Sequence, residues 1–209
     1  MKRLFSVGIA AGLLAAPAAA TTWTDWTSAS STTASGDAGG VTVSFSSTSA
    51  LAGSLTAGGT NYYTSWPTGA AQPSNTDILM LGASGTRTIT FSQAVTGVQL
   101  ALVSWNVPGT VTFNHAFANS VIGCGYWGCG SISPVVGNTG FTAHGEVHGT
   151  LTFAGPISTL TINDGGENWH GLTVGYEALA APVPEPETYA MLLAGLGLLG
   201  FMARRKKSV

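Results

Sequence analysis

The chain has 209 residues, enough for one folded domain of ordinary size with targeting segments at its ends. Only 8% of the residues are charged and 44% are hydrophobic, so the sequence lacks the high net charge and low hydropathy of a disordered chain. Between residues 21 and 181 a single cation, Arg87, accompanies seven carboxylates, which gives a net charge of −6 and excludes a nucleic-acid-binding protein.

The N-terminus has the pattern of a secretory signal peptide. Lys2 and Arg3 form a basic start, residues 4–16 form an apolar run, and a proline interrupts that run before three alanines. Small residues before Thr21 are typical of a signal peptidase cleavage site. We therefore expect residues 1–20 to form a signal helix that signal peptidase removes. The alternative is an uncleaved membrane anchor.

The next segments differ in their patterns. Residues 21–40 form a Ser/Thr/Gly-rich N-terminal segment, of which residues 27–40 predict a loop or spacer. In residues 41–179 apolar and polar residues alternate, as in 41–45 and 141–153, which is typical of half-buried strands. Residues 98–105 are apolar on both faces and predict a central strand.

Gly, Pro, Asn and Asp separate these runs at intervals typical of an all-β protein. We therefore predict an all-β fold for residues 41–179, with roughly eight to ten short antiparallel strands in two packed sheets. This ectodomain would be a jelly-roll-like β-sandwich.

The two cysteines, Cys124 and Cys129, flank the glycine-rich segment GCGYWGCG. In an oxidising compartment two cysteines at this spacing close a small ring, so we expect a disulfide that displays Tyr126 and Trp127. A catalytic thiol is the weaker alternative, because no His or basic residue lies nearby in sequence.

Six tryptophans are present, and Trp66, Trp127 and Trp169 lie in turn-like segments with polar neighbours. Exposed flat rings stack on the faces of sugars, and nearby Asn, Asp and Glu side chains bind hydroxyl groups. We take Trp127 and Trp169 as candidate sugar-binding residues. The alternative is that these loop aromatics fold back onto the core.

Two groups of residues are candidate metal ligands. His144, Glu146 and His148 are spaced two apart and would share one side of a strand, which offers a transition-metal set, although that side is also the expected solvent face. Asp164 and Glu167 lie in a glycine-rich segment and offer oxygens suited to Ca²⁺, although Asp beside Gly is also common in hairpin turns. We expect no required cofactor, with Ca²⁺ as a candidate ion.

The C-terminus combines three features. Residues 180–187 form a Pro-rich linker, residues 188–203 form an uncharged run, and residues 204–209 hold four consecutive cations, which are Arg204, Arg205, Lys206 and Lys207. As a helix, the uncharged run is about 24 Å long, somewhat short of a hydrocarbon layer of about 30 Å, and snorkelling of the arginines with local thinning of the bilayer covers the difference. The cations indicate a membrane stop at the cytoplasmic face. We predict a transmembrane helix over 188–203 with a basic cytoplasmic tail, the alternative being a buried core helix.

This arrangement, with the motif Pro184, Glu185 and Pro186 ahead of the helix and the basic cluster, closely resembles the PEP-CTERM sorting signal of Gram-negative bacteria. The resemblance covers residues 183–209. It implies recognition by an exosortase-type membrane protease and removal of the tail from the mature protein. It also implies a membrane-anchored intermediate, a final place at the cell surface or in the extracellular matrix, and a bacterium that makes exopolysaccharide.

Sequence motifs for catalysis are absent, since the chain has no nucleophile elbow, phosphate-binding loop or dinucleotide fingerprint. The sequence therefore predicts an exported, non-catalytic cell-surface or extracellular-matrix protein that associates with exopolysaccharide in a biofilm. A carbohydrate-binding, lectin-like module with or without Ca²⁺ is the alternative. A third interpretation is an extracellular hydrolase that uses Asp164 and Glu167 as its carboxylate pair.

Overall fold

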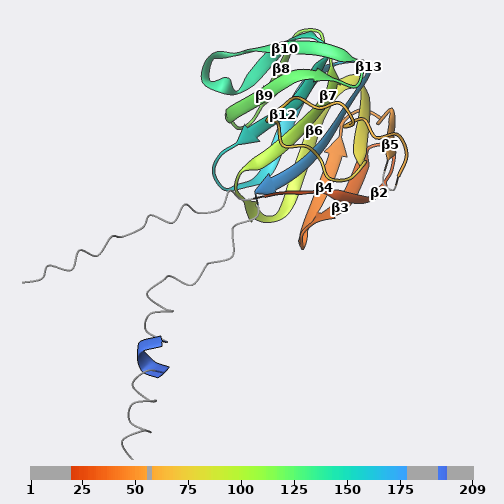
Figure 1. Cartoon of the computed structure of the whole chain (residues 1–209). Coiled ribbons are helices and arrows are strands. Elements are labelled where there is room, and N and C mark those ends of the chain that lie inside the picture. The colour runs from red at the N-terminus through yellow and green to blue at the C-terminus, as the bar shows by residue number, and fades with distance from the viewer. Residues whose placement is uncertain (1–19, 56–57, 178–192, 197–209) are drawn as a thin grey trace, which may run out of the picture. The chain divides into compact units, whose positions relative to one another are not determined.

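The computed structural model describes residues 20–55, 58–177 and 193–196 (Figure 1). Nearly all of residues 20–177 lie in β-strands or in the turns between them. The elements are β1 (Thr21–Trp23), β2 (Asp25–Ala29), β3 (Thr33–Ala38), β4 (Val41–Ser47), β5 (Gly53–Leu55), β6 (Ile78–Val95), β7 (Val98–Trp105), β8 (Thr110–Phe113), β9 (Phe117–Gly125), β10 (Gly128–Pro134), the 3₁₀ turn η1 (Val136–Asn138), β11 (Gly140–Gly145), β12 (Val147–Phe153) and β13 (Ile157–Glu177).

The strands form one antiparallel sheet in the order β2-β3-β4-β6-β13-β7-β12-β9-β10-β11-β8. Strand β8 also pairs with β13, and this second pairing closes part of the sheet into a barrel. The predicted all-β antiparallel fold is confirmed. The predicted two packed sheets of short strands differ from the structure, because β6 and β13 are 18 and 21 residues long and join both parts of the fold into one sheet.

The core follows the predicted alternation. In β4 the side chains of Val41, Val43 and Phe45 are buried while the residues between them are exposed. Every residue of β7 is buried, and the strand lies between β13 and β12, so the prediction of a central strand at 98–105 is confirmed. Each large apolar side chain buried in this way contributes about 1.5–3 kcal/mol to folding.

The predicted loop at residues 27–40 is wrong, because this segment contains the end of β2 and all of β3. Its inward positions include small residues, Ala34 and Ala38, which give a weak alternation signal. Trp26 anchors the segment: its side chain is fully buried and its Nε1–H donates to Thr173 Oγ1 at 3.1 Å. The Ser/Thr-rich stretch is therefore part of the folded domain.

A second, smaller group of buried aromatic and aliphatic side chains lies under the long loop between β5 and β6. This loop crosses the front of the sheet in Figure 1. Tyr63 of the loop is fully buried, and Thr150 of β12 donates its hydroxyl to the carbonyl of Ala71 at 2.8 Å. The loop therefore covers Thr150, which the sequence pattern places on a solvent face.

The predictions for the chain ends fall on residues outside the described ranges. These are the signal peptide, 1–20, of which only residue 20 is described, the linker, 180–187, the transmembrane helix, 188–203, of which residues 193–196 are described and helical, and the tail, 204–209. Among the described residues, none of the helices has the length and apolar character to cross a bilayer.

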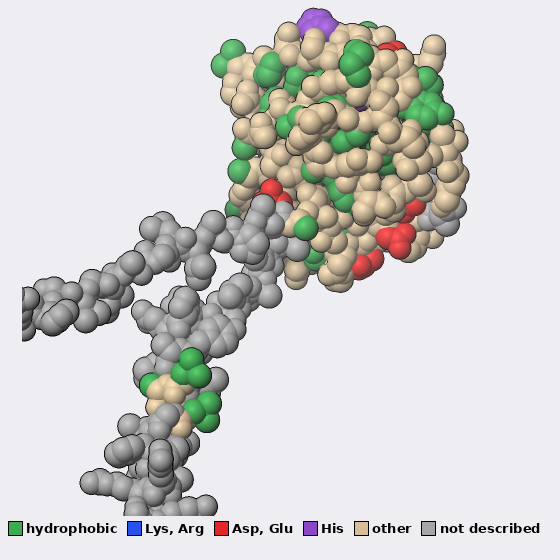
Figure 2. Space-filling view, in the orientation of Figure 1, with side chains coloured by type: hydrophobic (Ala, Val, Ile, Leu, Met, Phe, Trp, Pro, Cys, Tyr) green, Lys and Arg blue, Asp and Glu red, His purple; other side chains and the backbone are tan. Residues whose placement is uncertain are grey.

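A buried ion pair links β6 and β13. Arg87 Nε lies 3.1 Å from Asp164 Oδ2, and both side chains are fully buried. The guanidinium also donates to the hydroxyls of Ser47 and Ser49 and to the carbonyl of Ala83. On the face shown in Figure 2, the described surface carries some acidic side chains and no Lys or Arg. Arg87, the cation between residues 21 and 181, is thus buried inside the fold and does not reach the surface.

We expect Arg87→Met to destabilise the domain by about 3–5 kcal/mol, because it leaves the Asp164 carboxylate buried without a counter-charge. Denaturant unfolding at pH 7 measures the loss. The double variant Arg87→Met/Asp164→Asn removes both charges and should recover part of it. An Arg87→Met protein with wild-type stability would contradict this account.

Candidate functional site

A bulge in β13 presents one side of the site. Gly166 pairs with Ala83 of β6, but His170 pairs with Leu81, so four steps along β13 span two steps along β6. The additional residues leave the regular ladder, as in other β-bulges. They present Glu167, Asn168 and Trp169 to a cleft.

The bulge begins at a position that requires glycine. Gly166 has φ +68°, in the left-handed region, and a Cβ there would lie 2.1 Å from the backbone nitrogen of Ser84. Its N–H donates to Asp164 Oδ1 at 2.9 Å. The carboxylate that pairs with Arg87 therefore also fixes the start of the bulge.

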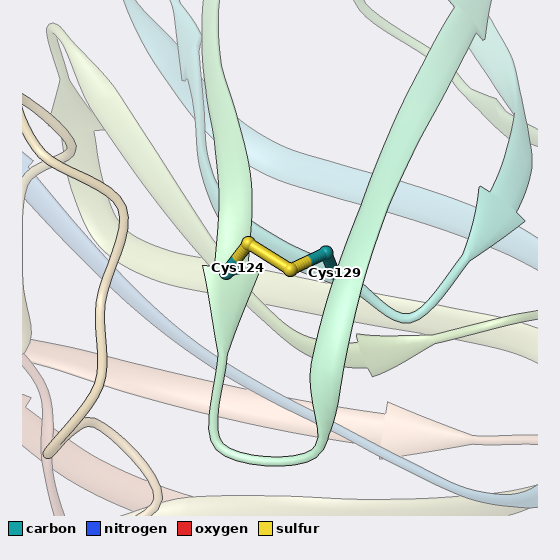
Figure 3. The surroundings of a disulfide bond; sticks show 2 residues. All are labelled: Cys124 and Cys129. Atoms are coloured by element: carbon teal, nitrogen blue, oxygen red, sulfur yellow. A yellow bond between two sulfur atoms is a disulfide. The ribbon is translucent and has the colours of Figure 1, made fainter.

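The opposite side of the site is the β9–β10 hairpin. Cys124 and Cys129 are cross-strand partners at its end, and a disulfide joins them (Figure 3). The four residues between them include Tyr126 and Trp127, whose side chains are 44% and 46% exposed. The expected disulfide is present in the structure, and the short loop that it closes carries the two exposed rings.

Four aromatic rings from three distant segments meet at the cleft. The ring centroids of Trp127 and Trp169 are 4.6 Å apart with an interplanar angle of 70°. Tyr62 of the long loop lies 5.0 Å from Trp127 and 5.1 Å from Trp169, and Tyr126 lies 4.9 Å from Trp127. The two tryptophans that the sequence singled out are therefore neighbours, and Trp127 keeps nearly half of its surface exposed.

The cleft between these aromatic and polar groups has a volume of about 560 Å³. This volume is within the range of about 300–1,000 Å³ that is common for small-ligand sites. Its lining, which we call the acidic aromatic cleft, consists of Ser104, Asn106, Trp127, Glu146, Glu167, Asn168 and Trp169.

Glu146 enters the cleft because the chain changes direction just before it. Strand β11 ends at Gly145, where φ is +74°, and β12 begins at Val147. Glu146 Oε2 accepts a hydrogen bond from the Ser104 hydroxyl. Ser104 is itself unusual, since it has φ +57° at a register shift of the β7–β12 pairing. Such backbone conformations cost free energy and concentrate at functional sites.

Glu167 lies deeper and has an altered acidity. Its Oε1 accepts the backbone N–H of Asn106 at 2.8 Å and lies 3.6 Å from Nδ1 of the buried His170. The pKa of Glu167 is raised to about 7, chiefly by burial, while the Asn106 hydrogen bond lowers it and the charges of Glu146 and Asp164 add to the rise. Burial lowers the pKa of His170, which keeps its ring neutral.

The predicted calcium ligands Asp164 and Glu167 do not converge. Asp164 Oδ1 lies 3.8 Å from Nε2 of His170, whereas Glu167 approaches Nδ1 of the same ring, so the imidazole lies between the two carboxylates. Asp164 is also fully buried against Arg87. Asp164 does not line the cleft that Glu167 lines, so the structure does not bring these two carboxylates together there. Within residues 20–55, 58–177 and 193–196, no three His, Cys, Asp or Glu side chains form a metal-binding group.

The predicted set of His144, Glu146 and His148 is also divided. His144 is exposed and its Nε2 lies 2.9 Å from the hydroxyl of Ser133. His148 is fully buried, burial lowers its pKa, and its Nδ1 accepts the backbone N–H of Ser104 at 3.3 Å. The prediction assumed one continuous strand, but the strand is interrupted between Gly145 and Val147, so the three side chains do not share a face.

A second hollow, of about 520 Å³, lies over β2, β3, β4 and β6. Hydroxyl side chains dominate its lining, for example those of Ser35, Ser44 and Thr90, and it contains no titratable group. Its size is similar to that of the acidic aromatic cleft, so chemistry rather than volume distinguishes the two.

Sequence reasoning missed two residues that line the acidic aromatic cleft and one residue that contacts its tryptophans. Ser104 and Asn106 lie where β7 ends, and Tyr62 reaches the site from a loop far away in the chain. The aromatic-rich segment NYYTSW, residues 61–66, is the signal that favours a role for Tyr62. Nothing in the sequence indicates the positive φ of Ser104.

The comparisons with known proteins give one match. Residues 182–206 match the model of the PEP-CTERM protein-sorting motif. No curated protein and no solved structure matches the chain. The suspected sorting signal is thereby confirmed, and such a motif indicates an exported protein that is anchored transiently in the membrane and processed by exosortase, a membrane protease.

We expect Glu167→Gln to change how stability depends on pH. The carboxyl is protonated up to about pH 7 in the folded state but only to about 4.5 in the unfolded state. Its contribution is therefore fully present below pH 4.5 and is lost as the pH rises to about 7. Unfolding free energies measured across this range should fall more for the wild type than for Glu167→Gln.

The comparison between variants is necessary because Asp77, His148 and His170 have shifted pKa values as well. Glu177→Gln removes a carboxylate outside the cleft and is the control for the loss of one carboxyl charge. Parallel pH profiles for the wild type and Glu167→Gln would show that Glu167 has an ordinary pKa.

We expect the double variant Cys124→Ser/Cys129→Ser to loosen the hairpin without unfolding the domain. A loop this short yields little entropy, so the stability loss should be about 2 kcal/mol or less. Near-ultraviolet circular dichroism should lose the signal of the coupled aromatic rings, and Trp127→Ala serves as the reference for that signal. An unchanged spectrum would mean that the rings stay in place without the disulfide.

Proposed function

Because residues 182–206 carry the sorting motif, we propose that the chain is an exported cell-surface or extracellular-matrix protein whose folded domain is a non-catalytic glycan-binding module. Exopolysaccharide around the cell is the proposed partner. The observation that carries the binding proposal is the aromatic pair Trp127 and Trp169 at the rim of a cleft that also holds carboxylate and amide side chains.

The aromatic rings supply the apolar contact that sugars need. The carbon-bound hydrogens of a pyranose ring form a flat apolar patch that packs on an indole face, while its hydroxyls need polar partners at the edge. In the cleft, Trp127 provides an exposed ring, and the side chains of Glu146, Glu167 and Asn168 lie beside it. This combination suits a polar ligand with one apolar face.

The charge distribution argues against phosphate-rich ligands. The Arg87 side chain is fully buried and paired with Asp164, so it is not available to a ligand. Proteins bind nucleic acids and strongly anionic polymers through several exposed Lys or Arg side chains. These side chains pair with the phosphates and release the counterions bound to them, which drives the association. A neutral or cationic glycan is compatible with this domain.

A hydrolase is the second candidate, and one observation favours it. Glu146 and Glu167 share a cleft, and the pKa of Glu167 is raised to about 7, a combination used by glycosidases for the general acid. We prefer the binding module because both carboxylates have a structural hydrogen bond, to Ser104 and to Asn106 respectively. Release of reducing ends by the wild type, abolished in Glu167→Gln, would decide for the hydrolase.

We expect Trp127→Ala and Trp169→Ala each to weaken polysaccharide binding about tenfold, a loss of about 1.4 kcal/mol that is typical of one stacking contact. A glycan array followed by calorimetry on the domain measures this effect. Trp127→Phe keeps a stacking ring and should bind more tightly than Trp127→Ala. Thr90→Val alters the second hollow and should bind like the wild type. Loss of binding in Thr90→Val alone would move the ligand to that hollow.

A further inference from the structure

The acidic aromatic cleft has a charge that neutral sugars do not require. It contains two carboxylates, Glu146 and Glu167, and no cationic side chain lines it. Arg87, the cation between residues 21 and 181, is fully buried in its pair with Asp164 and cannot neutralise a cleft carboxylate at the surface. The net charge of −6 over those residues also favours the approach of a cation.

The two carboxylates keep free hydrogen-bonding capacity toward the cleft. Glu146 Oε2 accepts from the Ser104 hydroxyl, and Glu167 Oε1 accepts from the backbone N–H of Asn106. In the described part of the chain, neither Glu146 Oε1 nor Glu167 Oε2 accepts a hydrogen bond from another residue. An ammonium group has three donors and no acceptor, so it matches two carboxylate oxygens that lack donors.

The aromatic rings add a second attraction for a cation. The faces of indole rings attract ammonium groups, and aromatic cages with nearby acids recognise amines in many proteins. Trp127 and Trp169 line the same cleft as the two glutamates. Hard metal ions would instead need six or more oxygen ligands, which two glutamates do not supply by themselves.

We propose that the acidic aromatic cleft binds glycans that carry free, protonated amino groups, with Glu146 and Glu167 as the ammonium acceptors and Trp127 as the stacking platform. This inference rests on the proposed glycan-binding function and specifies its ligand class. The pKa of Glu167 is raised chiefly by burial and further by Glu146 and Asp164, and a cation bound beside it would favour the ionised carboxylate.

The first experiment compares three oligosaccharides of equal length by calorimetry at pH 7 and low salt, where a substantial share of the glucosamine amines is protonated and Glu167, with its pKa of about 7, is partly ionised. They are a glucosamine oligomer, its fully N-acetylated counterpart and a neutral glucose oligomer. We expect the glucosamine oligomer to bind at least tenfold more tightly than either of the others. Added salt should reduce this preference, because it screens the carboxylates.

The second experiment uses variants that change charge but little else. Glu146→Gln and Glu167→Gln should each lower affinity for the glucosamine oligomer severalfold and leave the weak binding of the acetylated oligomer unchanged. Glu177→Gln removes the same charge outside the cleft and is the matched control. If Glu177→Gln weakens binding as much as the cleft variants, the attraction is a general charge effect and the proposed site is wrong.

A fixed-charge probe separates the titration of the protein from that of the ligand. An N-trimethylated glucosamine oligomer stays cationic at every pH, so a rise in its affinity between pH 6 and 8 reports the loss of a proton from the cleft. The charged or titratable groups around Glu167 are Glu146, Asp164, His170 and, beyond them, Arg87 and His148. The rise should vanish in Glu167→Gln, and a rise that persists there would contradict the assignment to Glu167.

The outcomes distinguish this inference from the proposed function. Equal binding of all three oligomers, with losses in Trp127→Ala but not in Glu167→Gln, would overturn the amine preference and leave a glycan-binding module. Absence of binding to every oligomer and polysaccharide, with no effect of the tryptophan variants, would overturn both. Tight binding of simple amines without a sugar ring would overturn the glycan part of the inference.

Discussion

The buried contact between Arg87 and Asp164 is the interaction on which the candidate site depends. A charge without a partner is strongly destabilising inside a protein, so each of these side chains fixes the position of the other. Asp164 also accepts the N–H of Gly166, which ties the start of the bulge to the pair between β6 and β13. The buried ion pair therefore fixes the position of the bulge that presents Glu167 and Trp169. It also keeps the Arg87 guanidinium away from the surface.

The cleft forms where the sheet departs from regularity. The bulge in β13, the strained Ser104 of β7 and the interruption after Gly145 each turn side chains out of the ladder toward one place. The regular strands around them supply rigidity, because β7 is buried along its whole length between two neighbours. A rigid frame with local irregularities keeps the groups that line the cleft ordered, and preorganisation of this kind lowers the entropy that a site loses when it binds a ligand.

The sequence predicted the parts of the fold that follow simple alternation and failed where alternation is weak or broken. The pattern at 41–45 and the apolar run at 98–105 were sufficient for β4 and β7. The segment 27–40 was mistaken for a loop because alanines, Ala34 and Ala38, occupy two of its buried positions. Trp127 and Trp169 were recognisable as loop aromatics, but their contact depends on a bulge and on the distant Tyr62. Glu146 was grouped with His144 and His148, but Gly145 has a positive φ and turns the chain just before Glu146.

The link between Cys124 and Cys129 ties completion of the cleft to the compartment in which the protein matures. Thiols stay reduced in the cytosol and are oxidised outside it. In a nascent chain the β9–β10 hairpin therefore lacks its disulfide, which forms after translocation. Until the disulfide forms, contacts with the neighbouring aromatic rings alone hold the Trp127 side chain in position. The hairpin that carries Trp127 is thus closed covalently only after the chain has left the cytosol.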